Sequence, residues 1–109
     1  MTLPAYLAHG VGALREAMAE VNPTNVSNLV EKTRLILGEL YDSAAKPEAI
    51  RDIFDQTHKS ILAFAMNYQQ NHNKGEQGKK QIALMGRQVE DNIDALESVL
   101  EKDASNDKA

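Results

Sequence analysis

The sequence contains no cysteine and no tryptophan, and tyrosine and phenylalanine together make up only 5% of its 109 residues. Without cysteine the chain has no disulfide, no thiolate ligand for zinc or an iron–sulfur cluster, and no thiol nucleophile. Its stability must therefore come from an apolar core, and a single domain of this length buries about 65% of its unfolded surface. The lack of cysteine fits a reducing compartment, so we expect a cytoplasmic protein.

Long apolar runs and a basic excess are also absent. No run of apolar residues is long enough to cross a bilayer, and the segment MTLPAYLAHGVGAL lacks the cationic start of a signal peptide. We therefore expect no membrane association. The net charge of -4 argues against a general nucleic-acid-binding protein, which normally has a basic face.

The chain offers few groups for catalysis or metal binding. Its five serines and three histidines are scattered and do not form a set of nucleophile, base and orienting group. Asp55 and His58 are spaced like half of a di-iron site, but such a site needs a second pair and two further glutamates. We expect no catalytic residues, no cofactor and no bound metal.

Residues 69–80, QQNHNKGEQGKK, contain no apolar side chain. A phosphate-binding loop needs four residues between its glycines, then lysine and a hydroxyl residue, all after a strand. Here two residues separate Gly75 from Gly78, and a second lysine replaces the hydroxyl residue. This excludes a nucleotide-hydrolysing site and predicts a loop or a solvated helix end.

Charge is distributed unevenly around this segment. Residues 72–80 carry three lysines against Glu76, a net charge of +2, whereas residues 81–109 carry seven acids against three bases, a net charge of -4. A basic patch beside an acidic helix can set the orientation of a partner. The basic patch consists of Lys74, Lys79 and Lys80.

Apolar residues recur every three or four positions in four segments, which predicts four amphipathic helices. We place them at residues 3–21, 23–44, 47–71 and 79–102. The third has the clearest stripe, formed by Ile50, Ile53, Phe54, Thr57, Ile61, Phe64, Ala65 and Tyr68. Residues 1–102 are expected to form one helical domain, and residues 103–109 a polar, flexible tail.

The simplest way to bury these stripes is an all-α fold, a three- to four-helix antiparallel bundle. Gly10 lies on the first stripe, where a small residue lets a second helix approach closely. The third and fourth helices are predicted to be longer than the others, and their uncovered ends favour self-association, most simply a dimer. Alternatively, the break at residues 75–78 closes only in part and leaves a long helical arm that pairs with a second copy.

Some apolar residues lie off the predicted stripes. Leu35 and Leu84 are single residues opposite the stripes of their helices, and isolated exposed leucines need no explanation. Leu62 and Met66 are different, because they lie one turn apart on the third helix. Two interpretations stay open for this pair: an interface patch, or a second buried face of the helix.

These observations favour a non-enzymatic helical interaction protein, such as an adaptor, an inhibitor or a chaperone-like module. The expected partner-binding residues are Leu62 and Met66 as apolar anchors, with Lys74, Lys79 and Lys80 as a charged rim. The alternative is a small oligomeric regulator that binds nucleic acid or another anion through the basic loop at residues 74–80, with a steep salt dependence. An enzyme with a site between subunits is the third hypothesis.

Overall fold

The computed structural model describes residues 3–107, and the side chains of residues 3–104. It contains four α-helices and one short 3-10 helix, and the described residues include no strand. The helices are α1 (Ala5–Ala19), α2 (Val26–Ser43), η1 (Pro47–Ile50), α3 (Arg51–Asn71) and α4 (Gly75–Asp107). The all-α fold expected from the sequence is confirmed.

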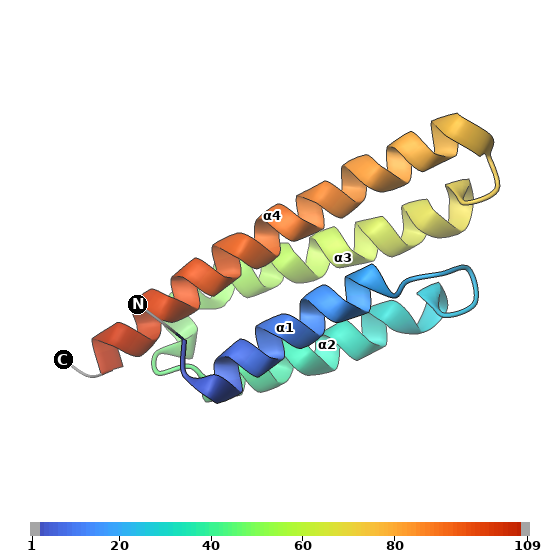
Figure 1. Ribbon diagram of the computed structural model, residues 1–109. Helices are drawn as coiled ribbons and strands as arrows, with labels where there is room; N and C mark the ends of the chain where they lie inside the picture. The colour runs from blue at the N-terminus through green and yellow to red at the C-terminus, as the bar shows by residue number, and fades with distance from the viewer. Residues whose placement is uncertain (1–2, 108–109) are drawn as a thin grey trace.

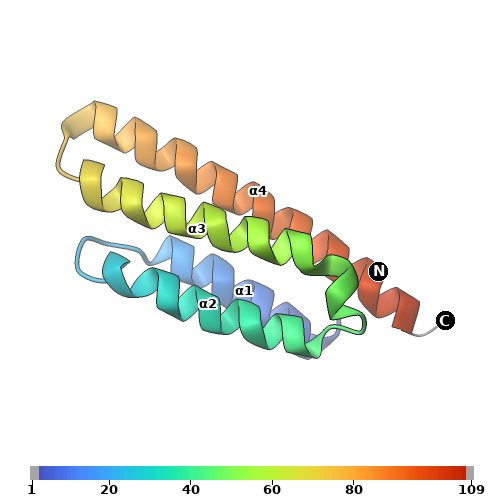
Figure 2. The ribbon, with the colours of Figure 1, turned by 180° about the vertical axis from the view of Figure 1, so that it is seen from behind.

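The four α-helices pack side by side with alternating direction (Figure 1). α1 contacts α2 and α4, and α3 contacts α2 and α4, with the α3–α4 contact the most extensive. The bundle is elongated, measuring 52 × 21 × 20 Å. The α3–α4 hairpin extends beyond the α1–α2 hairpin at the end where α3 turns into α4 (Figures 1 and 2).

The predicted apolar stripes form the core. Leu14, Ile61, Ile93, Leu96 and Leu100 are among its fully buried side chains. Two threonines of the stripes are equally buried, because each hydroxyl donates a hydrogen bond to a carbonyl of its own helix: Thr33 to Leu29 at 2.8 Å and Thr57 to Ile53 at 2.7 Å.

Gly10 allows α1 to approach α2, as its place on the first stripe predicts. A Cβ atom at this position would lie only 2.6 Å from Cδ2 of Leu40. The glycine therefore exchanges some helix propensity for closer packing.

The start of α2 differs from the prediction by three residues. Asn22 does not cap a helix at residue 23; its side-chain oxygen instead accepts hydrogen bonds from the backbone N–H groups of Thr24 and Asn25, both at 2.9 Å. This local turn delays the helix until Val26, whose N–H donates to the Asn22 carbonyl. Short polar side chains compete with helical hydrogen bonds in this way.

The connection between α3 and α4 is a short turn of residues 72–74, and α4 begins at Gly75 rather than near residue 79. Gly75 has a φ of 67°, in the left-handed region that favours glycine. Gly78 is buried against the end of α3, and a Cβ atom there would overlap the carbonyl oxygen of Asn71. The two glycines let the chain reverse within a few residues, so α3 and α4 fold back on each other and no extended arm forms.

The expected polar tail is largely helical, since α4 continues through Asp107. Asp103 is only 4% exposed, and its carboxylate accepts hydrogen bonds from the backbone N–H groups of Ala45, at 2.7 Å, and Lys46, at 2.9 Å. These donors follow the end of α2 and have no helical acceptor. The contact anchors the C-terminal part of α4 to the α2–α3 connection. Residues 108 and 109 of the predicted tail lie outside the described residues.

Candidate protein-interaction surface

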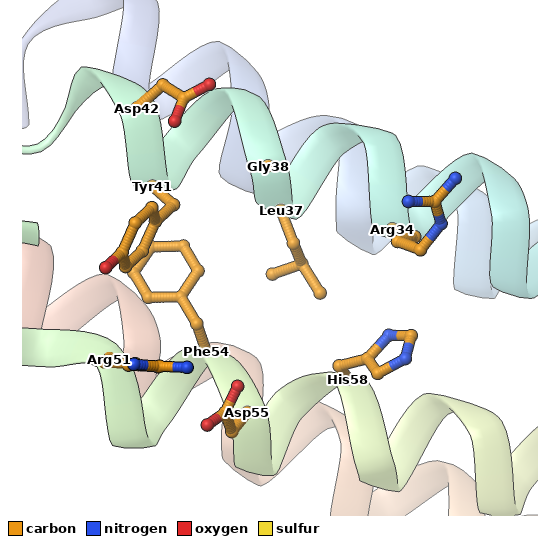
Figure 3. Close-up of a pocket in the computed structure, with 9 residues that line it drawn as sticks. All are labelled: Arg34, Leu37, Gly38, Tyr41, Asp42, Arg51, Phe54, Asp55 and His58. Atoms are coloured by element: carbon orange, nitrogen blue, oxygen red, sulfur yellow. The ribbon is translucent and has the colours of Figure 1, made fainter.

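An open groove of about 570 Å³ runs between α2 and α3 (Figure 3). Its floor is apolar and consists of Leu37 and Tyr41 from α2 and Phe54 from α3. Tyr41 and Phe54 meet edge to face, with ring centroids 5.4 Å apart and ring planes at 87°. Such a pair is rigid and offers a preformed apolar surface.

Polar side chains, including charges of both signs, surround this floor: Arg34 and Asp42 from α2, and Arg51, Asp55 and His58 from α3. Arg34 is bound to Glu31, one turn away, with a shortest N–O distance of 2.6 Å. This hydrogen bond and the charge attraction raise the pKa of Arg34 and lower the pKa of Glu31. Within residues 3–104, Asp42, Arg51 and Asp55 make no ion pair, so they are available to a partner.

Leu62 and Met66 lie farther along α3 and are not among the residues that line the groove. They follow Asp55 and His58 at spacings of three and four residues, which keeps all four side chains on one side of the helix. Leu62 is 42% exposed and Met66 is 53% exposed, whereas the adjacent Ile61 is fully buried in the core. No second buried face covers the pair within the bundle, so the apolar surface remains open.

The predicted basic residues lie at the α3–α4 turn. Lys74 and Lys80 border one shallow depression together with Asn71, Gln77 and Gln81. Lys79 is separate, because its ammonium group lies 3.8 Å from the carboxylate of Glu76, and both side chains are strongly exposed. The structure therefore brings two of the three lysines together.

The lysines and the apolar pair belong to different sides of α3. Asn71, which borders the lysine depression, lies about 140° around the helix axis from Met66. The depression is between α3 and α4, whereas Leu62 and Met66 follow the α2 side. The anchors and their expected charged rim thus do not form one continuous patch.

The projecting half of the α3–α4 hairpin is nevertheless basic as a whole. Residues 58–89 hold five lysine or arginine side chains and one acid, a net charge of +4, and the remaining residues carry a net charge of -8. Charge segregation of this size produces an oriented electrostatic field around a small protein.

An ion-pair cluster joins α1 to α4 at the other half of the molecule. Arg15 contacts Asp94 at 2.7 Å and Glu97 at 3.2 Å. Its pKa is raised, first by the hydrogen bond with Glu97 and then by the one with Asp94. The pattern of apolar residues does not reveal this contact, since the residues involved lie outside every stripe.

Sequence reasoning also missed the groove itself. Tyr41 lies beside Leu40 but is not part of the stripe predicted for residues 23–44, and Arg34, Asp42 and Arg51 have the pattern of solvated residues on helix faces. The signal for the groove in the sequence is Gly38, which lies between the large apolar residues Leu37 and Tyr41. A residue without a side chain leaves open space between them. Only the pairing of α2 with α3 shows that these residues face Phe54.

Asp55 and His58 lie on the groove wall, and the described residues contain no group of three or more side chains suited to hold a metal ion. None of the described helices has the length and apolar character needed to cross a membrane. The chain matches no protein-family model, no curated protein and no solved structure.

Proposed function

We propose that this chain is a non-enzymatic, cytoplasmic interaction module, an adaptor, inhibitor or chaperone-like protein that receives a protein partner on the α2–α3 side of its bundle. The observation that carries the proposal is the exposed apolar pair of Leu62 and Met66, which lies on the same side of α3 as the groove-wall residues Asp55 and His58. The groove and the pair together place apolar surface and charges of both signs along this side of α3. Apolar surface rimmed by charges is typical of the centre of a protein interface.

The energetics support anchoring by the apolar pair. Covering the exposed parts of Leu62 and Met66 is worth about 1 kcal/mol for each side chain. Methionine adapts its shape to a partner, and the preformed Tyr41–Phe54 pair adds rigid surface farther along the same helix. The basic half of the hairpin would steer an acidic partner toward this side and raise its association rate.

The proposal is tested by affinity capture from native lysate with mass spectrometry. The wild type is compared with the Leu62→Asp/Met66→Asp variant and with Leu35→Asp as a matched control. Leu35 is 57% exposed on α2, on the side opposite its buried stripe. We expect the double variant to lose partners that the control retains, with far-ultraviolet circular dichroism showing that all three remain folded. Recovery of the same partners by the double variant would contradict the proposal.

We further propose that the protein self-associates as a dimer through the two long C-terminal helices. The projecting α3–α4 hairpin and the exposed side chain of Leu84 support this proposal. Light scattering over increasing protein concentration measures the mass directly. A protein that stays monomeric at low ionic strength up to hundreds of micromolar would contradict the proposed dimer.

A second candidate function is the binding of nucleic acid or another anion at the α3–α4 turn. It is supported by the shared depression of Lys74 and Lys80 and by the +4 charge of residues 58–89. Fluorescence anisotropy with labelled DNA would show an affinity that falls steeply with salt and falls again in Lys74→Gln/Lys80→Gln. Binding to the protein partner on the α2–α3 side would change little in the same variant.

A further inference from the structure

The outward face of α4 carries a regular row of exposed side chains. Val89, Ile93, Leu96 and Leu100 are fully buried on the opposite face. The exposed row recurs at steps of three and four residues, which keeps it on one side of the helix. It consists of Glu76, Lys80, Leu84, Arg87, Asp91, Asp94, Ser98 and Lys102.

The row is symmetric about the level of Val89. Arg87 and Asp91 are equally distant from this level on either side, and so are Glu76 and Lys102. In both couples the two charges are opposite. The two remaining couples join Leu84 with Asp94 and Lys80 with Ser98, and neither places like charges together.

We propose that two copies of the chain dimerise by antiparallel packing of α4 on α4, with the two-fold axis at the level of Val89. In this arrangement Arg87 of each copy meets Asp91 of the other, and Glu76 meets Lys102. A two-fold axis repeats every contact, so each couple forms twice. The inference rests on the self-association proposed above and specifies its surface, direction and register.

The charges specify the direction of packing. Parallel packing of the same faces would bring Arg87 against Arg87 and Asp91 against Asp91, which is repulsive. Within one chain, Arg87 and Asp91 make no ion pair among the described residues, so both remain available to a second copy. Asp94 is held by Arg15 at 2.7 Å, which orients its carboxylate beside the position expected for Leu84 of the second copy.

The contact is long but mostly polar. From Glu76 to Lys102 the row extends for about 39 Å along the helix axis. Its only large apolar member is Leu84, which is 55% exposed. Exposed ion pairs are individually weak and are screened by salt. The dimer is therefore expected to be weak and to dissociate as ionic strength rises.

This mode of dimerisation leaves the α2–α3 groove open, because the groove is lined by residues of α2 and α3 alone. A dimer then presents two grooves. A partner with two binding segments would gain affinity from the second contact without any new interaction.

Charge reversal tests the register. Arg87→Asp and Asp91→Arg each replace the attractive couple with a repulsive one, and the double variant restores attraction with the signs exchanged. An equimolar mixture of the two single variants restores it as well, since one copy then carries only acids and the other only bases at these positions. Sedimentation equilibrium at low ionic strength, up to hundreds of micromolar protein, measures the mass relative to the 12.0 kDa chain.

We expect the wild type, the double variant and the mixture to dimerise, and each single variant to show a dissociation constant at least about tenfold higher, a change typical of charged couples across an interface. Glu39→Lys, on the exposed side of α2, is the matched charge-reversal control and should dimerise like the wild type. A monomeric wild type overturns both this inference and the proposed self-association. A dimer that both single reversals leave intact, or that the double variant fails to restore, overturns the α4 register alone.

Discussion

The carboxylate of Asp103 accepts the backbone N–H of Ala45 at 2.7 Å, although 58 positions separate the two residues. The same side chain accepts the N–H of Lys46. Both donors lie just beyond α2, where the helix no longer supplies acceptors. One nearly buried carboxylate thus accepts the backbone hydrogen bonds of the α2–α3 connection, which the apolar core does not cover.

Removal of this carboxylate should destabilise the bundle. Asp103→Ala leaves two backbone donors without their acceptor, and we expect the free energy of unfolding to fall by about 2 kcal/mol. Asp103→Asn, which keeps one acceptor oxygen, should lose less. Urea denaturation followed by circular dichroism measures both, with the exposed Glu90→Gln as the control on the same helix. Equal stability of Asp103→Ala and the control would show that the contact contributes nothing.

Two glycine-to-alanine changes should shift stability in opposite directions. At Gly78 a methyl group would overlap the carbonyl oxygen of Asn71, so we expect a loss of about 2 kcal/mol. At Gly12 no atom lies within 4 Å of an added Cβ, and the higher helix propensity of alanine should stabilise α1 by about 1 kcal/mol. Thermal denaturation compares the two variants. A Gly78→Ala protein that melts at or above the wild-type temperature would refute the tight α3–α4 turn.

Truncation to alanine should cost different amounts of stability at the neighbouring residues Ile61 and Leu62 of α3. Ile61 is fully buried, and Ile61→Ala is expected to cost about 3 kcal/mol because it leaves a cavity. Leu62 is 42% exposed, and Leu62→Ala should cost about 1 kcal/mol. Chemical denaturation distinguishes the two. Similar losses at both positions would mean that Leu62 is covered in solution.

The Glu31–Arg34 ion pair makes the pKa of Glu31 depend on the presence of Arg34. The hydrogen bond from Arg34, aided by its charge, lowers the pKa of Glu31. A lowered pKa contributes stability above the unfolded-state pKa, and this contribution is lost as the pH falls through the folded-state value. Because both side chains are strongly exposed, the effect on stability is slight and is best followed by carbon NMR of the carboxyl group. Arg34→Gln should move the pKa of Glu31 up toward its ordinary value, and an unchanged pKa would show that the pair does not persist in solution.

Periodicity predicts the helices and the core of this protein well, because the stripes of α1, α2 and α3 alternate with polar faces at helical spacing. It placed the start of α4 too late, since residues 75–81 contain no apolar side chain to reveal the periodicity. The sequence pattern makes Gly78 part of a break between two helices. In the structure it is the close contact that allows α4 to begin early.

The candidate surfaces were predictable only in part. Leu62 and Met66 could be singled out from their place off the stripe, which left an interface patch and a second buried face open. The groove farther along α3 could not be predicted, because it depends on how Tyr41 meets Phe54 across two helices. For the same reason the sequence pattern places Asp103 in a polar, flexible tail, because its carboxylate accepts hydrogen bonds from donors more than fifty positions away. Pairwise contacts between distant segments are not encoded in the periodicity of either segment.

An even number of alternating helices places the first and last described residues of the chain at the same end of the bundle, together with the α2–α3 connection (Figure 1). Among the described residues, the opposite end carries only the two hairpin turns. A label, an affinity tag or a fused domain attached at either terminus would therefore stand away from the basic α3–α4 turn. Surface immobilisation through a terminus should leave that end facing the solution.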